Sequence, residues 1–103
     1  MKTVQIEIQY FDGCPHSKDF IGIVRRALES AGCEYSYKET LVDTFEKAKE
    51  ARFRGSPTLL INGTDLENAE PPREPGLNCR VYRNGLPTED QVAERLLAAS
   101  RDS

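Results

Sequence analysis

The stretch TVQIEIQYFDGCPHS (residues 3–17) decides the fold of this 103-residue chain. Apolar side chains occupy every second position of residues 4–10, with glutamine or glutamate between them. Such alternation predicts a strand with one apolar face. Asp12-Gly13 ends the strand, and Pro15 can occupy the first turn of a following helix, where its missing N–H costs nothing. The stretch therefore predicts a strand that passes through a short turn into a helix.

The remaining segments follow from periodicity and turn signals. They are a helix over 20–28 ended by Gly32, a strand at 33–38, a helix from Asp43 with Glu46 as its capping partner, a strand at 58–61, a loop at 64–78, a strand at 79–83 and a helix capped by Thr88 and Gln91. Asn62-Gly63 is a strong turn signal. Because helices separate the first three strands, we expect a parallel βαβ unit with a right-handed crossover.

Composition limits the classes of function. The net charge of -3 and the scattered basic residues argue against nucleic-acid binding. No stretch approaches the ~20 apolar residues of a membrane span. An alternating strand, rather than an unbroken apolar run, follows the first two residues, so we expect no signal peptide and a cytoplasmic location.

Three cysteines, at positions 14, 33 and 79, form an odd and sparse set. In a reducing cytosol such a set indicates catalytic, metal-binding or inert thiols rather than a disulfide framework. Close Cys pairs typical of zinc sites are missing from the sequence, and His16 is its only histidine. We therefore expect no metal site.

Cys14 has the setting of a reactive thiol. The first N–H groups of a helix are unpaired and carry a partial positive charge, which stabilises a nearby thiolate and lowers its pKa. His16 could add a charge or a hydrogen bond. Ser17 stands where a second cysteine would resolve a mixed disulfide, and its hydroxyl can bind the thiolate but cannot displace it.

Two motifs carry a resemblance to a known family. The segment CPHS, residues 14–17, resembles the Cys-Pro-His-Cys site of DsbA-type thioredoxin-fold oxidases, with the last cysteine replaced. The segment FRGSPT, residues 53–58, is similar to the Gly-Thr-Pro-Thr segment of thioredoxin-fold proteins. The resemblance implies one α/β domain over residues 1–103. Its expected architecture is βαβαββα, with a four-stranded mixed sheet in the order 2-1-3-4 and three helices, one on one face and two on the other.

The resemblance also implies roles for individual residues. Cys14 would be the nucleophile, His16 would tune it and Ser17 would hold the resolving position. Pro57 would be cis and face Cys14. Substrate would bind at four positions, with the Ser56 backbone pairing with a peptide or thiol compound: Pro15, Ser56, Pro57 and Thr58.

These roles predict a monothiol thiol–disulfide oxidoreductase. Cys14 would attack a protein or small-molecule disulfide, and an external thiol such as glutathione would clear the mixed disulfide. We expect no other cofactor, and a monomer or weak dimer. One alternative is a thioredoxin-fold binding module without turnover, in which the Pro57 edge and the acidic loop 64–78 hold a partner. Another is the handling of a thiophilic metal by Cys14 and a second thiol.

The other two cysteines are expected to be small buried side chains. With the sheet order 2-1-3-4, both Cys33 and Cys79 would begin outer strands at the edge opposite Cys14. They would also lie three strand spacings of ~4.8 Å apart, beyond the ~7 Å limit on Cα separation in a disulfide. The expected fold therefore predicts no disulfide within the chain.

Overall fold

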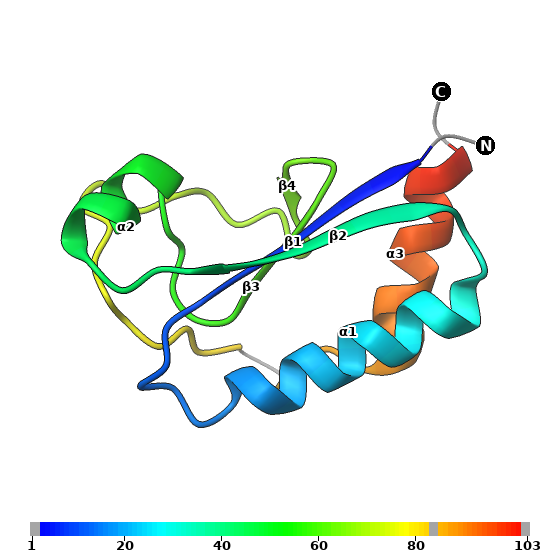
Figure 1. Cartoon of the computed structure of the whole chain (residues 1–103), viewed down its shortest axis with the longest axis horizontal. Coiled ribbons are helices and arrows are strands. Elements are labelled where there is room, and N and C mark those ends of the chain that lie inside the picture. Colours follow the sequence, from blue (N-terminus) through cyan, green and yellow to red (C-terminus); the bar gives the residue numbers. More distant parts are fainter. Residues whose placement is uncertain (1–2, 83–84, 102–103) are drawn as a thin grey trace.

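The computed structural model describes residues 3–82 and 85–101. Their helices and strands occur in the order β1 (Val4–Tyr10), α1 (Ser17–Ala31), β2 (Tyr35–Leu41), α2 (Phe45–Ala51), β3 (Thr58–Ile61), β4 (Thr64–Asp65) and α3 (Glu89–Arg101). The four strands form one sheet in the order β2-β1-β3-β4. This confirms the α/β class and the thioredoxin-fold order βαβαββα (Figure 1).

The strand directions explain how the site is assembled. β1 and β2 are parallel, whereas β3 is antiparallel to β1, with Gln9 opposite Thr58. The predicted parallel unit therefore holds for β1 and β2 but is wrong for β3. Helix α2 has only seven residues and lies beyond the end where β2 finishes, so the chain re-enters the sheet from that same end (Figure 1).

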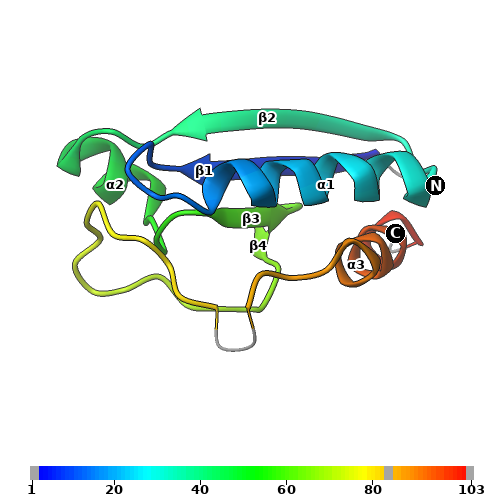
Figure 2. The same cartoon turned by 90° about the horizontal axis from the view of Figure 1, so that it is seen from below.

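The main core lies between one face of the sheet and helices α1 and α3. Helix α1 runs along that face, whereas α3 is seen nearly end-on beside the far end of α1 (Figure 2). The alternating residues Val4, Ile6 and Ile8 are almost completely buried there. Phe20 and Leu96 approach them from the two helices and are fully buried. A smaller cluster of Val42, Ala48 and Phe53 holds α2 at the far end of the sheet.

Local signals fixed most helix ends. Thr88 and Gln91 exchange hydrogen bonds at the start of α3, as predicted. Gly32 ends α1 in the left-handed conformation, which glycine adopts without a steric penalty. Two starts differ from prediction: α1 begins after His16, so Pro15 precedes it, and Thr44 rather than Asp43 caps α2 by accepting a hydrogen bond from the Lys47 N–H.

The fourth strand is the main error in the expected fold. Strand β4 follows directly from the tight turn at Asn62-Gly63, where both residues have positive φ, as a two-residue hairpin requires. The predicted strand at 79–83 is absent over its described part, residues 79–82, apart from one isolated bridge at Cys79. Its last residue, Arg83, lies outside the described residues, as does Asn84.

None of the helices in residues 3–82 and 85–101 combines the length and apolar character needed to cross a membrane.

Candidate redox site

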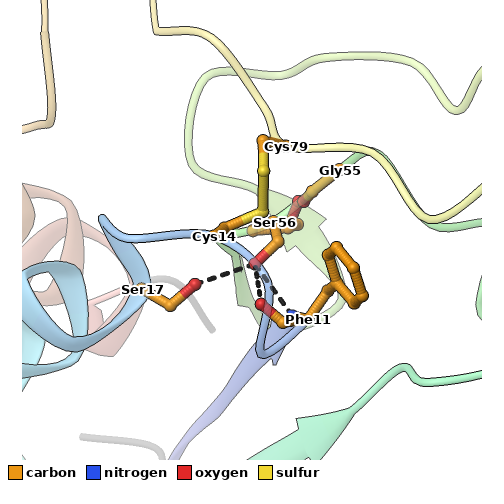
Figure 3. The surroundings of a disulfide bond; sticks show 7 residues. Phe11, Cys14, Ser17, Gly55, Ser56 and Cys79 are labelled. Atoms are coloured by element: carbon orange, nitrogen blue, oxygen red, sulfur yellow. Dashed lines mark hydrogen bonds between the residues drawn. A yellow bond between two sulfur atoms is a disulfide. The ribbon is translucent and has the colours of Figure 1, made fainter.

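Cys14 and Cys79 are joined by a disulfide (Figure 3). Their Cα atoms lie 5.7 Å apart, although 65 positions separate them in the sequence. The expectations that Cys79 is a buried, unbonded residue and that the chain contains no disulfide are therefore wrong. The turn before α1 holds one cysteine of the pair, and the second is Cys79, which follows the loop after β4.

Two differences from the expected strands bring Cys79 to Cys14: β3 is antiparallel to β1, and the fourth strand is β4 rather than residues 79–83. Since β3 runs back along β1, its first residues lie beside the end of β1, next to Cys14. Residues 66–78 follow the short β4 and return to that same end of the sheet (Figure 2). Cys79 thus lies at the entrance of β3 rather than at the start of an outer strand.

Residues 78–82, here called the return segment, pair with the backbone of Ser56 through one isolated parallel bridge. The Ser56 N–H donates to the Asn78 carbonyl at 2.9 Å, and the Arg80 N–H donates to the Ser56 carbonyl at 2.8 Å. Both backbone groups of Ser56 that were expected to pair with a bound peptide are therefore occupied by the chain itself. Gly55 permits this close approach, because a Cβ there would lie 3.0 Å from the Arg80 Cβ.

A buried ion pair with Asp65 of β4 holds the return segment in place. The Arg80 guanidinium donates to both carboxylate oxygens of Asp65, at 2.6 and 2.9 Å, and Asp65 is only 2% exposed. The Asp65 carboxylate also accepts from the backbone N–H groups of Glu67 and Ala69. Burial opposes its ionisation, but the hydrogen bonds from Arg80 and Ala69 outweigh that cost and hold the pKa of Asp65 below its usual value.

Tyr82 gives the return segment a second anchor. Its hydroxyl donates to the Pro57 carbonyl at 2.6 Å. Its ring lies against Phe20 of α1 and beneath the Arg80 guanidinium, with 4.6 Å from the guanidinium carbon to the ring centroid. Burial raises the pKa of the Tyr82 phenol, which therefore stays a neutral donor.

The turn before Pro57 is tied to the start of α1. The Ser56–Pro57 peptide bond is cis, as the resemblance implied. The Ser56 hydroxyl accepts from the Phe11 N–H at 2.8 Å and lies 2.9 Å from the Ser17 hydroxyl (Figure 3). Ser17, expected to interact with the Cys14 thiolate, thus bonds the turn that carries Pro57.

The predicted site residues differ in exposure. Cys14 is buried, whereas Pro15 and His16 are exposed. Thr58 is fully buried, and its hydroxyl donates to the Gly55 carbonyl at 2.6 Å. A cavity of about 560 Å³ adjoins Cys14 and is also lined by Lys18. The site is therefore open on the α1 side, while its cis-proline side is covered by the return segment.

Four residues important to this arrangement were missed as site residues: Asp65, Cys79, Arg80 and Tyr82. The Asn62-Gly63 turn could have placed Asp65 in a strand, because that signal predicts an immediate hairpin. Nothing in the local pattern of the return segment indicates its partner. Cys33 does behave as predicted, being a buried free thiol in the main core.

No protein-family model matches the chain, and no curated protein matches it. A function for this chain is therefore inferred from the arrangement of its own residues. Among the residues that the structure describes, no group of three or more His, Cys, Asp or Glu side chains could hold a metal ion.

Proposed function

We propose that the chain performs thiol–disulfide exchange with Cys14 and Cys79 as its redox pair. The observation that carries this proposal is the Cys14–Cys79 disulfide, which lies between the start of α1 and the cis-Pro57 turn. The expected monothiol route is thereby replaced by a two-cysteine cycle. Cys79 supplies the second sulfur of the cycle, which Ser17 lacks.

Each reductive turnover transfers two electrons. An external thiolate attacks one sulfur of the pair, forms a mixed disulfide and releases the other sulfur as a thiolate. A second external thiol then attacks the mixed disulfide, which yields an external disulfide and the reduced cysteine pair. Oxidation runs the same steps in reverse, with a small disulfide as the electron acceptor.

The occupied Ser56 backbone supports small thiols as the substrate class. An extended peptide that paired there would have to displace the return segment from both of its Ser56 hydrogen bonds. It would also have to pull Arg80 away from the buried Asp65 carboxylate. A low-molecular-weight thiol needs neither displacement to reach the disulfide.

The experiment is equilibration of the chain with glutathione buffers of stepped redox potential. Alkylation and intact-mass measurement then give the fraction of each form. We expect one transition between the dithiol and the intramolecular disulfide in the wild type. Cys14→Ser and Cys79→Ser should form no intramolecular disulfide, and their remaining thiol of the pair can only add one glutathione. A pair that stays oxidised in reduced glutathione alone, or that never closes in oxidised glutathione, would contradict the proposal.

One observation favours a second candidate, the binding of a thiophilic metal. The expected fold placed the other cysteines far from Cys14, which argued against this alternative. In the structure, reduction of the disulfide would instead leave two thiols whose Cα atoms lie 5.7 Å apart. Soft ions such as Cu(I) are held by thiolates. Titration of the reduced chain with Cu(I) should show one ion bound per wild-type chain and a much weaker association in Cys79→Ser.

A further inference from the structure

We infer that Cys79, rather than Cys14, is the cysteine that exchanges with the external thiol. Cys14 is then the internal thiolate that leaves during reduction and returns during oxidation. This inference rests on the proposed redox pair and reverses the order that the CPHS resemblance implies. Three features of the described residues support it: exposure, anchoring and the surroundings of Cys14.

Exposure separates the two sulfur-bearing residues. Cys14 is only 6% exposed, and the cavity beside Lys18 on the α1 side adjoins it. Cys79 is an exposed residue, as is Val81, which is 90% exposed. The alternate residues Arg80 and Tyr82 are less exposed and face the protein. Cys79 and Val81 therefore lie on the outer side of the return segment. A thiolate that approaches the outer side of the return segment therefore meets Cys79 first, whereas an approach to Cys14 leads through the cavity on the α1 side.

Anchoring keeps Cys79 at the site in both redox states. The Ser56 backbone, Asp65 and the Pro57 carbonyl hold the return segment through contacts that do not involve sulfur. Breaking the disulfide leaves these contacts in place. Cys79 can therefore bind an external thiol and still face Cys14, which gives the internal thiolate a high effective concentration.

Cys14 is the better leaving group of the two. It precedes α1, whose N-cap residue, His16, makes no side-chain capping bond to the first N–H groups. These groups and the helix dipole favour negative charge at that end of the helix. Since a thiol of lower pKa leaves faster in disulfide exchange, the bond breaks more readily toward Cys14. Cys79 lies on an extended segment with no helix start beside it.

The steps balance as follows. The external thiolate forms a bond to the Cys79 sulfur, the Cys14–Cys79 bond breaks, and its electron pair stays on the Cys14 sulfur. A second external thiolate attacks the external sulfur of the mixed disulfide and releases the Cys79 thiolate. In the oxidative direction, Cys79 attacks the small disulfide, and Cys14 then expels the bound thiol by attacking the Cys79 sulfur.

A trapping experiment on the wild-type chain tests this order. The oxidised chain is mixed with reduced glutathione and iodoacetamide, so that any released thiolate is alkylated before the disulfide closes again. Trypsin separates the two positions, because cleavage at lysine and arginine places Cys14 in residues 3–18 and Cys79 in residues 74–80. We expect glutathione on Cys79 and alkylated Cys14, with roughly tenfold excess over the opposite pattern.

The outcomes separate this inference from the proposed function. Glutathione mainly on Cys14, or equally on both cysteines, would overturn the inference, while the redox pair itself would stand. A disulfide that glutathione does not open, but that dithiothreitol reduces, would overturn both. Cys14→Ser serves as the control for the trap: Cys79 should take glutathione from oxidised glutathione and retain it, because no internal thiolate can remove it.

Discussion

The α1–α3 side of the sheet and the return segment are held in place by different physical means. On the α1–α3 side, apolar side chains at regular spacing bury one another, with Phe20 and Leu96 fully buried. The return segment contributes no regular strand or helix. It is fixed by a disulfide, a buried ion pair and a few specific hydrogen bonds.

This difference has consequences for both stability and chemistry. Burial of apolar surface is non-directional and depends little on redox state or pH. The return segment is held in part by one disulfide and one carboxylate, so a reductant removes one of its anchors and acid weakens another, while its backbone hydrogen bonds to Ser56 stay. The sheet and its helices thus stay stable, whereas the attachment of the return segment, which positions Cys79, weakens in reductant and in acid.

The largest expected effect concerns the core. Phe20→Ala removes a fully buried ring and leaves a cavity, so we expect a loss of about 3–5 kcal/mol in unfolding free energy. Urea unfolding of the oxidised chain measures it. Phe45→Ala is the matched control, because Phe45 is 67% exposed and its loss should change stability by about 0.5 kcal/mol or less. Equal effects of the two changes would contradict the assigned core.

Reduction of the disulfide should have the next largest effect. The bond closes a loop with a sequence separation of 65, and losing such a bond typically costs about 2–4 kcal/mol. We therefore expect dithiothreitol to lower the urea midpoint of the wild type. Dithiothreitol should leave the midpoint of Cys14→Ser unchanged, and a similar shift in that variant would exclude the disulfide as the cause.

Asp65→Asn tests the ion pair beneath the return segment. The substitution keeps an oxygen acceptor but leaves the Arg80 guanidinium without its buried counter-charge. We expect a loss of about 2 kcal/mol, less than for a fully buried pair because Glu67 stays 3.6 Å from Arg80. Glu67→Gln is the control, since this half-exposed carboxylate should contribute less than about 1 kcal/mol.

Acid should weaken the same anchor. Because the pKa of Asp65 is lower in the folded chain than in the unfolded one, its stabilisation is complete above the ordinary value near ~4 and is lost as pH falls through the folded pKa. The wild type should therefore lose more stability than Asp65→Asn as the pH falls below the ordinary carboxyl pKa. Parallel pH profiles of the two chains would show that the carboxylate contributes nothing.

The sequence predicted the periodic part of the molecule well. Alternation over residues 4–10 gave β1, and the sheet order and the cis-Pro57 turn agreed with the two short motifs. β1 follows from its local pattern and from the burial that this pattern demands, whereas the sheet order and the cis bond were implied by the resemblance. The functional roles of His16, Ser17 and Pro15 stay predictions.

The return segment could not be placed in the same way. Its position depends on contacts between residues far apart in the chain, such as Arg80 with Asp65 and Cys79 with Cys14. The alternating pattern of residues 79–82 is typical of a strand, but it fits an irregular extended segment equally well. The direction of β3 added a further error, because only the position of α2 in space shows which end of the sheet the chain re-enters (Figure 1).

The smallest expected effect concerns a contact that the sequence did predict. Thr88→Ala removes the side chain that accepts from the Gln91 N–H at the start of α3, so we expect a loss of about 1 kcal/mol. Thr88→Ser should restore most of it, because serine caps helices equally well. Neither substitution touches the return segment, so the rate at which glutathione opens the disulfide should stay at the wild-type value in both. A changed rate would mean that α3 and the return segment are coupled, and that the core and the redox site do not respond independently.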